Sequence, residues 1–193
     1  MNFKNIIQDI HNAQLETFCL LKEFRGNEGT SILPTKRRGL YWIWTTLNHD
    51  EFRNIDKPKD KKKHVPVGEL TRKRIGLNNI YTEKNELGFS VIYNGIGGYN
   101  KTPTSSCLRK RVNQELNCEN ENTGTLNLLN IKNQNGEKIF NLENCGISFF
   151  DFDDEKNKSI IAQLNSEEPY KDYAKDLEML WRLEYGTPIL SRH

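Results

Sequence analysis

Apolar residues recur along the chain in patterns that predict both helices and strands. Between residues 3 and 24 they follow helical spacing with one polar face, which predicts an amphipathic helix ended by the glycines from Gly26 onward. Three later runs, at 39–46, 88–94 and 146–152, are short, nearly continuous and rich in aromatic and β-branched residues. Each run is too short for a helix and fits a buried strand.

Two more helices are expected in the second half of the chain. One is capped by Thr104 or Ser105 and runs to about Leu116, with its apolar residues on one arc. The other has its apolar residues at helical spacing and is stopped by Gly186 and Pro188. Both helices are expected to pack on the predicted strands.

Together these elements predict an α+β fold, with a small three-stranded antiparallel or mixed sheet flanked by helices. The chain divides into an N-terminal helical extension over 1–30 and a main domain over 31–193. A basic insertion at about 47–87 separates the first two strands. A chain of 193 residues is long enough to bury a core without disulfides.

The composition argues against membrane and structural-zinc proteins, but the overall charge does not identify a binding partner. The 28 Lys and Arg nearly balance the 26 Asp and Glu, so the net charge of +2 does not mark a nucleic-acid binder. No apolar run approaches membrane-spanning length and no signal-peptide core is present, so we expect a cytoplasmic protein without a membrane partner. Scattered cysteines without a CxxC pair argue against a structural zinc site and predict free thiols, at Cys19, Cys107, Cys118 and Cys145.

Four short motifs follow one another along the predicted elements. Gly39-Leu40-Tyr41 lies on the first strand and Tyr93-Asn94-Gly95 on the second. Arg111 follows on the next helix, within LRKRV, and Glu178 lies on the last helix. This order resembles the GIY-YIG endonuclease family, in which two such tripeptides lie on neighbouring strands and are followed by a helical Arg and a helical Glu. The resemblance spans 39–191 and rests on these motifs.

The resemblance implies a restriction-type endonuclease that hydrolyses phosphodiester bonds in DNA with one divalent cation, Mg²⁺ or Mn²⁺. Glu178 would bind the metal, and Arg111 would hold the phosphoryl oxygens with its planar fork. Tyr41 would orient or deprotonate the attacking water, and Tyr93 would complete the pocket. An ordinary tyrosine pKa is about 10, so Tyr41 as a base requires a nearby cation that lowers its pKa.

The chain departs from the family pattern at three places. The family usually closes its site with an Asn after a proline, where this chain has Ser191 or the terminal His193 as substitutes. Glu115 stands one turn after the arginine, where several members carry His or Tyr. The tyrosines of the two tripeptides are also further apart than in compact members. The remaining supporting positions are Gly39 and Gly95.

Each of the four central residues also has a purely structural interpretation. Tyr41 and Tyr93 fit ordinary core tyrosines, although glycines after Tyr93 would let a backbone approach a ligand closely. Arg111 fits either an i,i+4 ion pair with Glu115 on a partly exposed helix or an arginine directed into a cleft. Glu178, at the margin of its apolar arc, fits either a surface pair one turn along its helix or a partly desolvated Mg²⁺ ligand.

Basic residues cluster in the insertion, which connects the two tripeptide strands. We expect DNA contacts there and on the following helix, and a solvated loop is the alternative for the lysine run. The candidate nucleic-acid-binding residues are Lys61, Lys62, Lys63, Arg72, Lys73, Arg74 and Arg109.

Two competing functions follow from the same residues. A GIY-YIG-like domain that binds nucleic acid without cutting it is favoured by the missing Asn and by Glu115. A structural or toxin-type interaction protein would use its tyrosines and glycines only for packing. RNA as the substrate and assembly into a homodimer are left as alternatives.

Overall fold

The computed structural model describes residues 3–25, 33, 36–55, 65–98, 107–117, 125–164 and 170–191. These ranges form the expected α+β fold, in which helices flank a sheet that is antiparallel throughout. The sheet has four strands in the order β1-β4-β2-β3, one strand more than the sequence predicts. None of the helices in these ranges has the length and apolar character needed to cross a bilayer.

The three predicted strands are present with small shifts at their ends. They are β2 (Gly39–Thr45), β3 (Ser90–Gly97) and β4 (Cys145–Asp151). The central strand β2 is buried along its whole length, as its continuous apolar sequence predicts. The connection between β2 and β3 contains two short helices, α3 (His49–Phe52) and α4 (Val67–Arg74).

The N-terminal helix is shorter than predicted, because α1 (Phe3–Glu16) ends where the chain turns toward β4. The Thr17 hydroxyl oxygen accepts a hydrogen bond of 2.9 Å from the backbone N–H of Phe149. The next residues form β1 (Cys19–Leu20), which pairs with β4, and α2 (Leu21–Arg25) follows. A helix continuing through 24 is therefore wrong, since part of this segment is the fourth strand.

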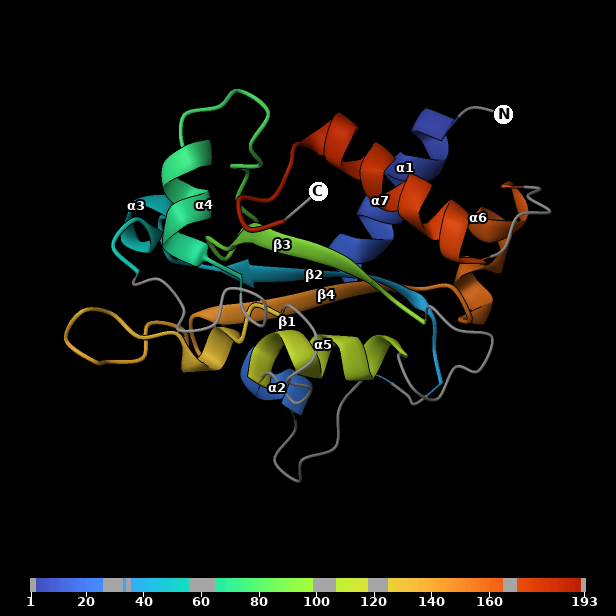
Figure 1. The fold of residues 1–193 in the computed structure, drawn as a ribbon. Coiled ribbons are helices and arrows are strands. Elements are labelled where there is room, and N and C mark those ends of the chain that lie inside the picture. The colour runs from blue at the N-terminus through green and yellow to red at the C-terminus, as the bar shows by residue number, and fades with distance from the viewer. Residues whose placement is uncertain are drawn as a thin grey trace.

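Helices cover both faces of the sheet (Figure 1). The face formed by Leu40 and Trp42 packs against α1 and α7, while the face formed by Tyr41 and Ile43 packs against α2 and α5. The bounds of the remaining elements are α5 (Leu108–Asn117), η1 (Leu128–Asn130), η2 (Glu155–Asn157), α6 (Lys158–Ala162) and α7 (Tyr170–Tyr185).

Tyr41 and Tyr93 point to the same face of the sheet. In the β2–β3 register Tyr41 lies opposite Gly95 and Ile43 lies opposite Tyr93. Residues two apart on a strand share a face, so both tyrosines face α5. A β-bulge follows immediately, because Trp44 pairs with Val91 and leaves Ile92 as the extra residue.

The segment after α7 returns along the outer edge of β3. The helix ends at Gly186, as predicted, in a backbone conformation with φ of 110° that favours glycine. The Leu190 N–H then donates to the carbonyl oxygen of Ile92 at 2.9 Å, and the Asn94 N–H donates to the Ser191 hydroxyl at 3.3 Å. The end of the described chain is thereby fixed to the strand that carries Tyr93.

The described cysteines agree with the prediction of free thiols. Cys19, Cys107 and Cys145 are all unpaired, and Cys118 lies outside the described residues. Within the described ranges the core is therefore held by apolar packing rather than by disulfides.

Candidate active site

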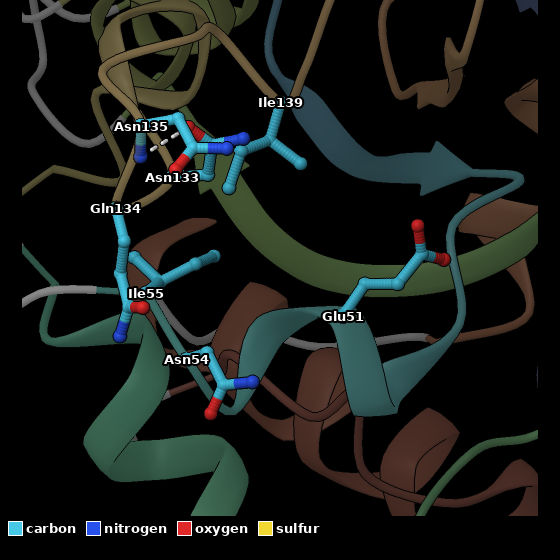
Figure 2. A pocket seen from close by; sticks show the side chains of 7 residues that line it. All are labelled: Glu51, Asn54, Ile55, Asn133, Gln134, Asn135 and Ile139. Carbon is cyan, nitrogen blue, oxygen red and sulfur yellow. Dashed lines mark hydrogen bonds between the residues drawn. The ribbon is translucent and has the colours of Figure 1, made fainter.

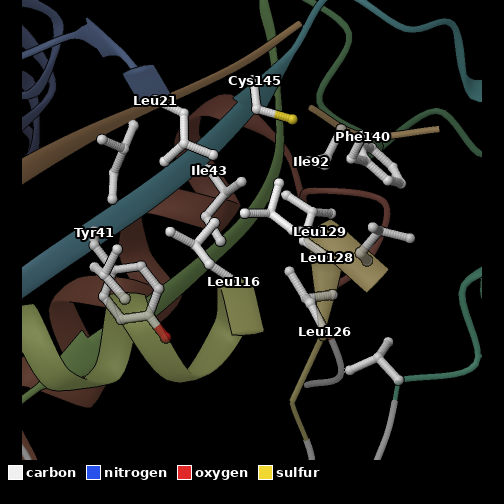
Figure 3. Close-up of a cluster of buried hydrophobic side chains, with 14 of the residues drawn as sticks. Leu21, Tyr41, Ile43, Ile92, Leu116, Leu126, Leu128, Leu129, Phe140 and Cys145 are labelled. Carbon is white, nitrogen blue, oxygen red and sulfur yellow. The ribbon is translucent and has the colours of Figure 1, made fainter. Parts of the chain in front are cut away.

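Two tyrosines converge on one carboxylate beneath α5. The Tyr41 hydroxyl donates to Glu115 Oε1 at 3.3 Å, and the Tyr93 hydroxyl donates to the same oxygen at 3.4 Å. The two rings lie 6.2 Å apart. Figure 3 shows the ring of Tyr41 among apolar side chains with its hydroxyl end at α5. The first and second tripeptides are therefore joined through a residue of the following helix.

Glu115 is the centre of this hydrogen-bond network. Its side chain is completely buried, and Arg111 Nη2 lies 2.9 Å from Oε1. The backbone N–H of Leu126 donates to Oε2 at 2.8 Å. Burial raises the pKa of Glu115, and Arg111, the Leu126 amide and the two tyrosine hydroxyls oppose that rise. A buried carboxylate with four partners is stable only because each of them replaces a bond to water.

The pKa of Tyr41 is raised, which is the opposite of what a tyrosine base requires. Its side chain is fully buried, and burial, followed by the charge of Glu115, raises its pKa well above 10. Arg111 opposes this rise without reversing it. The expected lowering by a nearby cation is therefore wrong, because Glu115 already balances that cation. Tyr93 has a raised pKa for the same two causes, but its side chain is partly exposed.

The glycines of the two tripeptides are needed for close packing. A Cβ atom at Gly95 would lie 2.4 Å from the Tyr41 hydroxyl, and one at Gly39 would lie 2.2 Å from the carbonyl oxygen of Phe150. Neither contact is tolerated without movement of the neighbouring group. Gly95 thus makes room for the tyrosine opposite it, and Gly39 allows β4 to approach β2.

Arg111 combines features of both interpretations of the sequence. It forms the i,i+4 ion pair with Glu115, and its Nη1 donates to Gln114 at 2.9 Å. The pair is not on an exposed helix face, since the Arg111 side chain is only 19% exposed. Its Nε is buried and has no hydrogen-bond partner among the described residues. A buried N–H without a partner costs free energy in this state, and an anionic oxygen can reach Arg111 only through the 19% of its side chain that is exposed.

Glu178 lies in a second, half-buried ion pair, on the other layer of helices. Its Oε1 accepts from Arg182 Nη2 at 2.7 Å, and the two side chains are 16% and 13% exposed. Arg182 also donates through Nε to Asn94 Oδ1 at 2.9 Å, and the Ser191 hydroxyl donates to the same oxygen at 2.9 Å. The pair with Arg182 exists as the structural interpretation expects, but it is half-buried rather than fully on the surface.

The two ion pairs act on one another across the edge strand β3. The charge of Glu178 contributes to the raised pKa values of Tyr41 and Tyr93. Burial raises the pKa of Glu178 itself, while Arg182 and then Arg111 lower it. The structure thus gathers Tyr41, Tyr93 and Arg111 around Glu115, while Glu178 lies on the other layer of helices and acts on the two tyrosines through its charge.

Within the described residues no group of three or more His, Cys, Asp or Glu could hold a metal ion. A single partly exposed carboxylate, with Oε1 of Glu178 engaged by Arg182, fits only a weakly held hard cation whose shell is completed by phosphate and water. That donor set suits Mg²⁺ better than Zn²⁺, which prefers His and Cys.

Several predicted nucleic-acid-binding residues have structural partners. Arg72 Nη1 donates to the carbonyl oxygen of Arg53, and Lys73 pairs with Glu69 at 2.8 Å on an exposed helix face. Arg74 Nη1 donates to the carbonyl oxygens of Ile189 and Ser191. Arg109 is partly exposed on α5. The remaining candidates lie outside the described residues, at Lys61, Lys62, Lys63 and His193.

Three further residues form hydrogen bonds or ion pairs that connect the candidate catalytic residues. Glu115, Arg182 and Asn94 link the catalytic candidates to one another. The sequence indicates Glu115 as a charge on the buried arc of α5 and Arg182 as the i,i+4 partner of Glu178, but it gives no sign that Asn94 accepts a hydrogen bond from Arg182. Ser191 occupies a place that supports β3, which is compatible with its predicted supporting role. In comparisons with known proteins, no family profile, no curated protein and no solved structure matches this chain.

Proposed function

We propose that this chain is a divalent-metal-dependent endonuclease that hydrolyses phosphodiester bonds in DNA. The observation that supports the proposal is the convergence of Tyr41, Tyr93 and Arg111 on Glu115, with Glu178 electrostatically coupled to them. Tyrosine hydroxyls, an arginine fork and a separate carboxylate are the groups that phosphodiester hydrolysis needs. The order of the motifs along the chain points in the same direction.

Each residue would have a role set by its exposure. Arg111 would bind a non-bridging phosphate oxygen through the part of its side chain that remains exposed, since its Nε is buried. Tyr93 is partly exposed, so its hydroxyl, rather than that of buried Tyr41, would meet the attacking water. Tyr93 would accept a proton from water as it gives its own to Glu115, whose raised pKa favours accepting it. Tyr41 would position Glu115 from behind.

Glu178 would hold the cation. Within the described residues its Oε1 is the oxygen engaged by Arg182, which leaves Oε2 to bind Mg²⁺ or Mn²⁺. When bound, the cation would neutralise charge that develops on the leaving oxygen. Arg182, fixed by Asn94, keeps the Glu178 side chain in one orientation.

A domain that binds nucleic acid without cutting it is the second candidate. It is favoured by the pairing of both arginines with carboxylates and by the burial of Tyr41, which leave few reactive groups free in this state. A structural or toxin-type interaction protein is a further alternative, and absence of binding to DNA and RNA at low salt would favour it.

Nicking of supercoiled plasmid by the full chain tests the proposal. We expect nicking with Mg²⁺ or Mn²⁺ and none with a chelator. Arg111→Lys keeps the charge next to Glu115 but loses the planar fork, so it should fold and nick far more slowly. Lys110→Arg, a charge-preserving change at an exposed position on the same helix, is the matched control and should nick normally. Binding of plasmid without any nicking by the unaltered chain would overturn the proposal in favour of the second candidate.

A further inference from the structure

A small surface pocket lined by side-chain amides lies between the end of α3 and a hairpin that precedes β4. Its volume is about 190 Å³, and its wall includes Glu51 of α3 together with Asn54 and Ile55, which follow that helix. The hairpin contributes Asn133, Gln134 and Asn135 (Figure 2). Four amide side chains around one pocket form a surface that can both donate and accept hydrogen bonds.

The hairpin is built so that its tip presents two of these amides. Lys132 and Lys138 pair across its base. Asn133 Oδ1 accepts from the backbone N–H groups of Asn135 and Glu137, both at 3.0 Å, so Asn133 holds the turn together. The side chains of Gln134 and Asn135 are exposed and, within the described ranges, form no side-chain hydrogen bond. The backbone of the turn is held by Asn133, so the side-chain amides of Gln134 and Asn135 are available to bind a ligand.

The chemistry of the lining favours a base edge over a phosphate. No basic side chain lines the pocket, and one acidic residue, Glu51, does. Glu51 and Glu137 are engaged in local bonds, to the Asn48 N–H at 2.6 Å and to Asn133 Nδ2 at 2.9 Å. Positive charge lies instead on the exposed lysines at the hairpin base, Lys132 and Lys138. Phosphates would be repelled by the carboxylate of Glu51 in the pocket and attracted to Lys132 and Lys138 at its rim.

We infer that the hairpin 132–138 and this pocket read base edges in the major groove of duplex DNA. A two-stranded ribbon fits the major groove, and Asn or Gln there pairs with N6 and N7 of adenine. Lys132 and Lys138 at the rim contact phosphates on either side. This inference rests on the proposed function in taking DNA as the partner, and it assigns the source of sequence preference.

The length of the connecting chain limits the distance between the hairpin and the candidate active site. The Leu126 N–H is bonded to Glu115, and the chain then passes through η1, which packs on α5, to Lys132. From Leu126 to Asn135, at the tip of the hairpin, an extended chain spans at most about 32 Å. At roughly 3.4 Å per base pair, the bases that are read would lie within about nine base pairs of Glu115.

Selection of preferred sequences from duplexes with a randomised central segment tests the inference. The full chain, held without divalent metal, is compared with Gln134→Ala/Asn135→Ala. We expect the variant to lose about 5- to 150-fold of its discrimination at one or two positions, the range for one lost base contact. Its affinity for duplexes of unrelated sequence should be unchanged. Asn135 has no positive φ, so alanine fits the turn.

The matched control is Asn12→Ala/Gln163→Ala, which removes the same two residue types from exposed positions on α1 and just after α6. It should keep the preference of the unaltered chain. A chain without any base preference, a preference that survives in the hairpin variant, or tighter binding to RNA duplexes of the same sequence would each overturn the inference. Base preference that depends on the hairpin in a chain that never nicks plasmid would support the inference and overturn the proposed nuclease.

Discussion

Tyr93 and Asn94 are consecutive on β3 and bind opposite layers of the molecule. The Tyr93 hydroxyl donates to Glu115 on α5, and Asn94 Oδ1 accepts from Arg182 on α7. Each of these helical residues belongs to an ion pair that is largely shielded from solvent. A small displacement of β3 would thus disturb both pairs at once, so the strand couples the candidate phosphate-binding arginine to the candidate metal ligand.

Replacing Glu178 by Gln should abolish most cleavage while the protein stays folded. Gln keeps the volume and an oxygen that accepts from Arg182, so the loss of stability should be about 1 kcal/mol. Loss of the charge should slow single-turnover cleavage by ~10²–10³-fold, typical for one electrostatic stabiliser. Glu184→Gln, on the same helix in a surface pair with Lys4, is the control and should cut normally. Equal rates at limiting Mg²⁺ would make Glu178 a structural residue.

The two tyrosines should differ in their effects on both stability and cleavage. Tyr93→Phe removes the hydroxyl that would pass a proton from water to Glu115, and loss of acid–base assistance typically slows the chemical step by ~10²–10⁴-fold. Tyr41→Phe removes a hydroxyl that only positions Glu115, so it should slow cleavage less. The fully buried Tyr41 should also lose about 1 kcal/mol of unfolding free energy, and Tyr93 less. Tyr81→Phe, which alters a buried tyrosine in the α7 layer, should cut normally. Unslowed single-turnover cleavage by Tyr93→Phe would remove it from water activation.

Cleavage should fall on acidification at a pH above the ordinary range of a glutamate. Burial raises the pKa of Glu178 above its usual value of about 4.3, and only the carboxylate binds the cation. Activity should therefore be lost as pH falls through that raised pKa. Stability should change in the opposite direction, because a raised folded pKa favours the protonated form and unfolding free energy falls as pH rises through the same window.

Rate profiles and denaturant unfolding at matched pH would show both trends. Burial raises the pKa of Glu115 as well, so both glutamates contribute to the pH dependence of the unfolding free energy. Glu178→Gln should remove the contribution of Glu178 and leave that of Glu115. An acidic limb centred at the ordinary glutamate pKa would contradict the assignment.

Removing the lysine run should weaken DNA binding without regard to sequence. Lys61, Lys62 and Lys63 replaced together by Ala should reduce the slope of log affinity against log salt by up to about 0.9 for each phosphate contact that is lost. Three exposed lysines elsewhere, at Lys156, Lys158 and Lys175, give a control with the same change of charge. An unchanged slope would assign the run to a solvated loop.

The sequence predicted the strands and the buried arcs of two helices because their periodicity is local. Leu108, Val112 and Leu116 are buried as expected. On α7 the expected apolar arc has Ala174, Leu177 and Trp181 buried and Leu180 half-buried. The two-residue strand β1 could not be predicted, because it is too short to show alternation and it interrupts a helical pattern. Its place depends on pairing with β4, more than a hundred positions later.

The candidate residues of the site could be predicted, but their connections could not. Spacing gives the i,i+4 pair of Arg111 with Glu115, yet three other partners of Glu115 come from β2, β3 and the segment before η1. Arg74 is a similar case, since a basic residue in a basic insertion gives no sign that it binds the carbonyl oxygens of 189 and 191. Such contacts depend on chain folding over long distances.

The segment along the outer side of β3 limits how copies of this chain can associate. An unpaired sheet edge invites a strand from another molecule. Here the carbonyl oxygen of Ile92 and the N–H of Asn94 already bind Leu190 and Ser191. The opposite edge is β1, which offers only two residues for pairing. A homodimer of this protein would therefore have to join through side chains on its helices rather than by extending the sheet, and fibre-like growth through β3 is blocked while this segment stays in place.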